Sequence, residues 1–177
     1  MRLPISSPPS TNVPSSLASF ALAAALVCSP LDPAFAVSGG GKDYSGYTIS
    51  GQSLAGQKLN GKEFRGTFAK GTDFKGAALV GCSFFKADLS EADFSGADLS
   101  SASLEEAGLE EARLDNAVLV SAYLTKTIGD AASIKGADFS EAVMPQFTQR
   151  SLCDRPDATG TNAKTGVATR ESLMCPD

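Results

Sequence analysis

A large apolar residue recurs at every fifth position of this sequence, from Tyr44 to Met144. Of the 21 positions in that register, 19 are large and apolar, and the exceptions are Ala69 and Gly129. An α-helix turns once in 3.6 residues, so it would scatter this series around all of its sides. A continuous strand would send successive members to opposite faces, because five is odd. The chain must therefore turn once per repeat, so that each large residue points to one common axis.

The position two before each large residue is small, and it also points inward, near a corner of the turn. From position 77 to 122 it is Ala in every repeat except one, which has Cys82. We expect Cys82 to be a buried apolar residue, since the slot has no room for more than a small side chain. The other three positions of each repeat face water.

The consensus of the repeat is A-D-L/F-S-x, and Ala87 to Glu91 is a clean copy, ADLSE; ADFSG, ADLSS, ASLEE and ADFSE are others. This pattern resembles the pentapeptide-repeat family. The resemblance implies an all-β solenoid: a right-handed quadrilateral β-helix with four repeats, or twenty residues, in each coil. The repeat domain, taken as 37–144, would then hold about five coils. Residues twenty apart would stack in columns.

The two exceptions, Ala69 and Gly129, fall in the same one of these columns. Phe68 and Ile128 stand immediately before them. Two interpretations are open. Either the chain bulges at these points and Phe68 and Ile128 turn inward, or this face of the solenoid is loosely packed.

Residues 1–36 are predicted to be a targeting segment. The start of the chain is rich in Ser and has no acid, Leu17–Cys28 is apolar but too short to span a bilayer, and Ala34-Phe35-Ala36 is a cleavage site of the A-x-A type. A transit peptide joined to an export signal indicates the chloroplast thylakoid lumen; a bacterial periplasm or a cyanobacterial lumen is the alternative. No direct membrane insertion is expected of the mature form.

Residues 145–177 are predicted to form a short α-helical cap, because a solenoid end exposes its core and its unpaired strand edges. Cys153 and Cys175 flank this segment, and an exported protein meets an oxidising compartment, so a disulfide is expected; two free thiols are the alternative. The tail, Leu152 to Arg155 and Thr165 to Pro176, is similar to that of chloroplast lumenal pentapeptide-repeat proteins, which strengthens the lumenal prediction.

The amino-acid composition of the chain excludes some classes of function and argues against others. The chain has no His, so Ser-His-Asp and Cys-His catalysis and His-ligated metal sites are excluded. The net charge of −5 argues against a nucleic-acid partner. Asp73 and Asp93 would stack in one outward column and raise one another's pKa, but on a convex wall without a cleft. We therefore expect no enzyme activity and no cofactor or metal.

The predicted function is a non-enzymatic interaction protein, a scaffold or assembly factor for a photosynthetic complex of the thylakoid membrane. Its candidate partner surface is an outward apolar strip of Val80, Val118, Val120 and Tyr123. The alternative is a DNA mimic that binds topoisomerase, as some pentapeptide-repeat proteins do.

Overall fold

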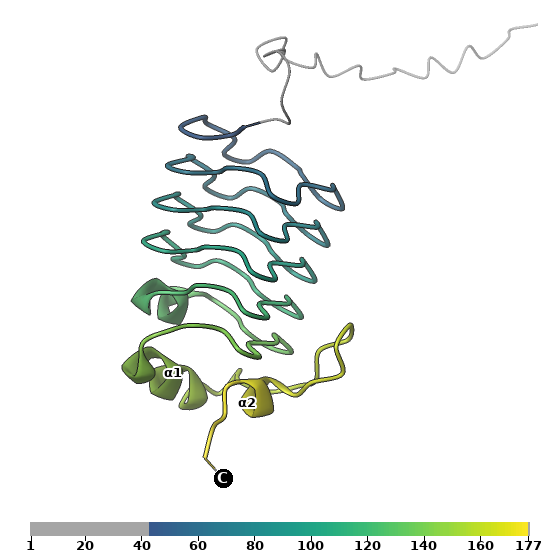
Figure 1. Cartoon of the computed structure of the whole chain (residues 1–177), viewed down its shortest axis with the longest axis vertical. Helices are drawn as coiled ribbons and strands as arrows, with labels where there is room; N and C mark the ends of the chain where they lie inside the picture. Colours follow the sequence, from purple (N-terminus) through teal and green to yellow (C-terminus); the bar gives the residue numbers. More distant parts are fainter. Residues whose placement is uncertain (1–42, 177) are drawn as a thin grey trace, which may run out of the picture. The chain divides into compact units, whose positions relative to one another are not determined.

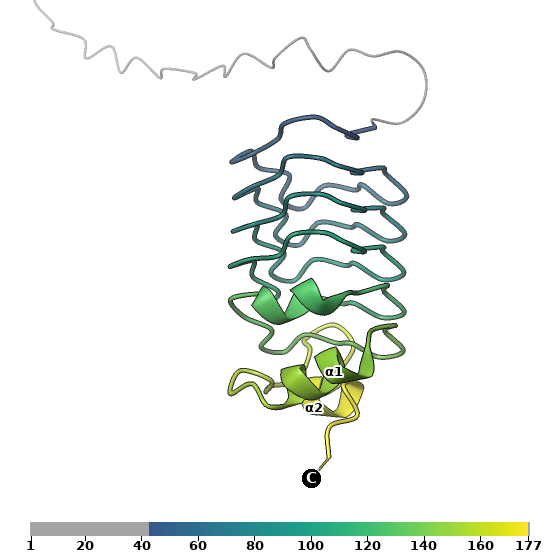
Figure 2. The ribbon, with the colours of Figure 1, turned by 90° about the vertical axis from the view of Figure 1, so that its left-hand side faces the viewer.

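The computed structural model describes residues 43–176, and in this part the chain winds in stacked coils (Figures 1 and 2). The coils are joined by single parallel bridges between residues twenty apart, such as Thr48 to Phe68 and Phe68 to Asp88. These short bridges replace extended strands, because the chain turns again after every repeat. The twenty-residue stacking register is confirmed. The predicted targeting segment, 1–36, lies outside the described residues, and the domain boundaries stay predictions.

Each regular corner of a coil is made by a residue in the left-handed region of backbone space. In the first coils that residue is glycine, as at Gly76, where φ is +61°. Later corners use other residues, as at Glu91, where φ is +60°. A non-glycine residue in this region costs about 1–2 kcal/mol. The ladder offsets this cost: the Glu91 amide donates to the Glu110 carbonyl of the next coil at 2.8 Å.

The core is a set of stacked columns, as the register predicts. Tyr44, Phe64 and Phe84 stack with ring centroids 4.6 and 4.7 Å apart. Phe74 and Phe94 stack at 4.8 Å in another column. Rings of the two columns meet edge to face, which is a favourable geometry for aromatic pairs. All five side chains are at most 4 % exposed.

The small inward slot near the corner also accepts short polar side chains. The Thr67 hydroxyl donates to the Tyr44 carbonyl at 2.7 Å. The Cys82 thiol lies 3.0 Å from the Leu59 carbonyl, also 23 residues back along the chain. Cys82 is a buried free cysteine, as predicted, and burial raises the pKa of its thiol to about 11. It is therefore protonated at any physiological pH.

The two exceptions to the repeat, Ala69 and Gly129, have different local structures. At the second, a short 3₁₀ helix, η2 (Lys126–Asp130), replaces the regular corner and turns Ile128 fully inward. At the first, Ala69 keeps the inward position and Phe68 stays 56 % exposed. The bulge interpretation is confirmed for Ile128 and is wrong for Phe68.

The C-terminal segment supplies hydrogen-bond acceptors to the open edge of the last coil. It contains α1 (Gln146–Cys153) and α2 (Thr169–Ser172) (Figure 1). Three backbone amides of the last coil find partners there. Ile134 donates to the Asp157 carboxylate at 2.9 Å, Gly136 to the Thr159 carbonyl at 2.8 Å, and Phe139 to the Ser172 hydroxyl oxygen at 3.0 Å. These three amides are thus no longer available for pairing with another chain.

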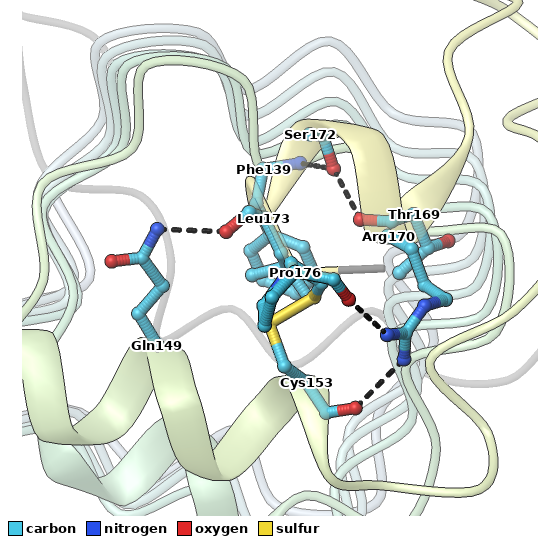
Figure 3. The surroundings of a disulfide bond; sticks show 9 residues. Phe139, Gln149, Cys153, Thr169, Arg170, Ser172, Leu173 and Pro176 are labelled. Atoms are coloured by element: carbon cyan, nitrogen blue, oxygen red, sulfur yellow. Dashed lines mark hydrogen bonds between the residues drawn. A yellow bond between two sulfur atoms is a disulfide. The ribbon is translucent and has the colours of Figure 1, made fainter.

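A disulfide joins the two helical parts of this segment, as predicted. Cys153 and Cys175 are bonded across a separation of 22 residues. Figure 3 shows the Arg170 guanidinium bridging the carbonyls of Cys153 and Pro176, at 2.9 and 3.1 Å. Gln149 on α1 also donates to the Leu173 carbonyl at 2.7 Å. Closing a loop of this length contributes about 3 kcal/mol by restricting the unfolded chain.

An arginine fastens this segment to the irregular turn at η2. The Arg155 guanidinium donates to the carbonyls of Gly129 and Ala131, each at 2.9 Å, and pairs with Asp157 at 2.8 Å. The hydrogen bond from Arg155 holds the pKa of Asp157 below its ordinary range. The carbonyls that η2 leaves without a ladder partner are satisfied in this way.

Candidate interaction surface

The apolar strip predicted from the register is not a continuous exposed surface. Val118 is only 5 % exposed, and Val80 and Val120 are half-buried. Tyr123 is 50 % exposed. Val118 does point away from the core of the coils, but it cannot contribute to an accessible strip, so that part of the expectation is corrected.

The C-terminal segment folds back onto the wall beside Val118, and this explains its burial. Asn162 is buried, and its amide donates to the carbonyls of Asn116, Ala117 and Gly136 at 3.2, 3.1 and 2.9 Å. Figure 1 shows this segment rising beside the last coils.

Asp138 lies one coil after Val118 and is bridged to it. The same C-terminal segment covers Asp138. Burial would raise its pKa, but hydrogen bonds from Ser140 and Thr165 outweigh burial and lower it.

Tyr123 and Val143 are apolar side chains that do reach solvent near this end, as are Phe147 and Met174 in the C-terminal segment. Tyr123 and Val143 are 50 and 56 % exposed and are bridged to one another in neighbouring coils. We call this pair the apolar step. Phe147, four residues after Val143 in α1, is 63 % exposed. Val143 was missed from the sequence, although it occupies the outward column of Tyr123, twenty residues later.

A groove of about 480 Å³ lies beside the disulfide. Its lining is mixed: Met174, Pro176 and the disulfide-bonded Cys153 stand beside the polar residues Gln146, Gln149, Arg150 and Asp154. Arg150 and Asp154 supply opposite charges, and the Gln149 amide is already engaged by the Leu173 carbonyl. Within residues 43–176 no group of three or more Cys, Asp or Glu side chains is placed to hold a metal ion.

The Asp93 carboxylate, on an outer wall, is held in its charged form. Asp93 is bridged to Asp73, as the twenty-residue column requires. Partial burial alone would raise the pKa of Asp93, but hydrogen bonds from Ser95 and the Lys75 ammonium, 3.1 Å away, lower it. The expectation of a raised pKa at Asp93 is therefore wrong, because it overlooked the hydrogen bonds from Ser95 and the ion pair with Lys75.

Basic residues are interspersed with the acids on these walls. Lys70 pairs with Glu91 at 3.1 Å and Lys86 with Glu106 at 3.5 Å, so these carboxylates do not form an uninterrupted anionic row. No helix in the described part of the chain is long and apolar enough to cross a bilayer.

Comparison with known proteins gives consistent matches. A family model described as pentapeptide repeats matches eight copies, over residues 82–119 and 107–144. The crystal structure of a pentapeptide-repeat protein from the thylakoid lumen of Arabidopsis thaliana is 37 % identical, with a TM-score of 0.69, over 76 % of this chain and 92 % of that one.

Two further relatives match over shorter stretches. The chloroplast thylakoid lumenal protein TL20.3 of Arabidopsis thaliana is 54 % identical over 44 residues, which are 25 % of this chain and 15 % of that protein. The chain therefore spans only a small part of that curated relative. A pentapeptide-repeat protein of Nostoc PCC 7120 is 29 % identical over 48 % of this chain and 70 % of its own, with a TM-score of 0.47.

Proposed function

Since this chain belongs to the pentapeptide-repeat family, we propose that it is a non-enzymatic scaffold, whose coils and helical cap present a rigid wall to a protein partner. Like its Arabidopsis relatives, it is a protein of the chloroplast thylakoid lumen. The partner is a photosynthetic membrane complex, contacted at its lumenal face. The apolar step, Tyr123 with Val143, is the observation that carries this proposal.

The apolar step is preorganised for binding. The Tyr123 amide donates to the Ala102 carbonyl and the Val143 amide to the Ala122 carbonyl, both at 2.9 Å. The backbone under both side chains is thus fixed before a partner arrives, so little conformational entropy is lost on contact. Tyrosine is also enriched at the energetic centres of interfaces, because it offers a large apolar area with one polar end.

The charge state of the wall supports a binding role over catalysis. A general acid or base works best with a pKa near the operating pH, which for a carboxyl group requires a large upward shift. The pKa values of Asp43, Asp93, Asp138 and Asp157 are all lowered instead. These four carboxyl groups are therefore ionised acceptors at physiological pH.

The double substitution Tyr123→Ser and Val143→Ser should abolish or strongly reduce co-purification of the mature protein with thylakoid complexes. Both side chains face solvent, so the coils should remain folded. Phe68→Ser is the matched control, because Phe68 is as exposed as Val143, at 56 %, but lies in a different outward column of the coils. Binding of the wild type should persist in moderate salt, since apolar contacts are not screened. If the double variant co-purifies as well as the wild type does, the apolar step is not the contact site.

A further inference from the structure

Charge is unevenly distributed along the coils. Between residues 43 and 86 there are six basic side chains and three acidic ones, whereas between 87 and 115 there are nine acidic side chains and one basic. Successive segments of the chain lie in successive coils, so the sequence asymmetry becomes a polarity along the stack. A basic end is followed by an acidic middle.

One outward column concentrates this polarity on a single wall. Arg65, Phe85 and Glu105 follow the buried Phe64, Phe84 and Leu104. Their carbonyls each accept an amide from the preceding coil, at 2.9, 2.9 and 3.1 Å, which aligns them. Arg65 and Glu105 are therefore two coil spacings apart, or roughly 10 Å, with Phe85 between them. We call these three residues the charged column.

The charges at the two ends of this column are not neutralised within the chain. Among residues 43–176, neither Arg65 nor Glu105 has an oppositely charged group within 4.0 Å. The Arg65 guanidinium lies 5.1 Å from the centre of the Phe85 ring, and the Lys86 ammonium lies 5.0 Å from it. Arg65 is thus held extended on the wall by the aromatic ring, with its hydrogen-bond donors free to reach a second molecule.

We propose that two copies of this protein associate side by side and antiparallel through the charged column. A two-fold axis in the plane of the wall, perpendicular to the stack and level with Phe85, reverses the order of the coils. Arg65 then faces Glu105 of the partner subunit, and the partner's Arg65 faces Glu105. The two Phe85 side chains lie level with the axis, each beside its own Arg65 guanidinium. The partner is a second copy of this chain, because the column runs from a positive to a negative charge. The same column in the opposite direction places a negative charge beside each positive one, and a symmetric interface requires this self-complementarity.

The contact should be weak and sensitive to salt. One wall of five residues by the height of the stack offers roughly 400 Å², about half of the ~800 Å² that each partner buries in a standard interface. The two ion pairs, one coil spacing from the axis on either side, steer and orient the copies more than they hold them. The association is therefore reversible. Tyr123 and Val143 lie on the same wall, in the outward column that precedes the buried Phe64, Phe84 and Leu104, so a second copy and the partner of the proposed function compete for this wall.

Sedimentation equilibrium of the mature chain tests this directly. We expect a monomer–dimer equilibrium at about 20 mM NaCl whose Kd rises about tenfold or more at about 500 mM NaCl. Arg65→Glu and Glu105→Arg should each raise the Kd about tenfold or more, because like charges then face one another. Lys58→Glu changes the net charge as much as Arg65→Glu does but lies in another outward column, so it should leave the Kd unchanged.

Mixing the two single variants is the decisive arm. In a mixed pair, Glu at 65 faces Arg at 105 in one contact, and Arg faces Glu in the other, so heterodimers should form at about the wild-type Kd. The double variant Arg65→Glu, Glu105→Arg should also dimerise again. The proposal is overturned if the wild type is monomeric at low salt, or if neither the mixture nor the double variant recovers association. Circular dichroism melts of each variant establish that the coils remain folded.

Discussion

Leu99→Asp should lower the free energy of unfolding by about 4 kcal/mol or more, because it places a carboxylate in a core without a partner. Leu99 is fully buried in a column of apolar residues twenty apart. Ser101→Asp, two residues along the same coil, should change it by less than about 0.5 kcal/mol, since exposed sites tolerate substitution. Ser101 is exposed with a φ of +57°, and Asp tolerates that conformation.

Urea denaturation followed by circular dichroism measures both variants on one scale. Both variants introduce an aspartate, and they differ in whether the position in the five-residue register points inward or outward. Equal destabilisation by the two substitutions would mean that the five-residue register does not decide which side chains are inside.

Phe84→Ala should lower the free energy of unfolding by about 3–5 kcal/mol, the range for removing an aromatic side chain from a packed core. Phe84 stacks on Phe64 and meets the edges of Phe74 and Phe94, with centroids 4.7, 6.0 and 5.9 Å away. Few atoms can move to fill the space, because each neighbouring ring is fixed by its own coil.

Phe68→Ala removes the same atoms from a side chain that is 56 % exposed, so it should cost less than about 1 kcal/mol. Thermal unfolding of the two variants side by side separates a packed aromatic ladder from a general preference for Phe. A Phe84→Ala variant as stable as Phe68→Ala would contradict the packing of this column.

The coils could be predicted from the sequence because one local rule repeats. Each large residue has the same neighbours twenty positions before and after it, so its burial follows from its register alone. The rule also located the points of departure, Ala69 and Gly129. It could not decide their outcome. At Gly129 a glycine leaves the inward slot without a side chain, and Ile128 fills it through η2. At Ala69 a methyl group is already inward, and the regular coil is kept.

The path of the C-terminal segment could not be predicted, because it depends on single side chains that act over long separations. Asn162 reaches carbonyls 45 and 46 residues back, and nothing in the polar run around it repeats. Its docking buries Val118, which the register could only place on the outside. The pKa of Asp93 shows the same limit. The column predicted Asp73 as its neighbour, but it could not predict the hydrogen bonds from Ser95 or the ion pair with Lys75, whose side chain reaches Asp93 from the coil of Asp73.

The most direct test of the scaffold role is cross-linking in intact thylakoids, followed by affinity purification of the wild-type mature protein and mass spectrometry of the linked peptides. We expect one recurrent partner from a photosynthetic membrane complex, with links from Lys126, three residues after Tyr123. Links from Lys58, which lies in another outward column, should be rare by comparison. Recovery of the protein with no partner other than itself, or with links spread evenly over its lysines, would contradict a scaffold that binds through this surface.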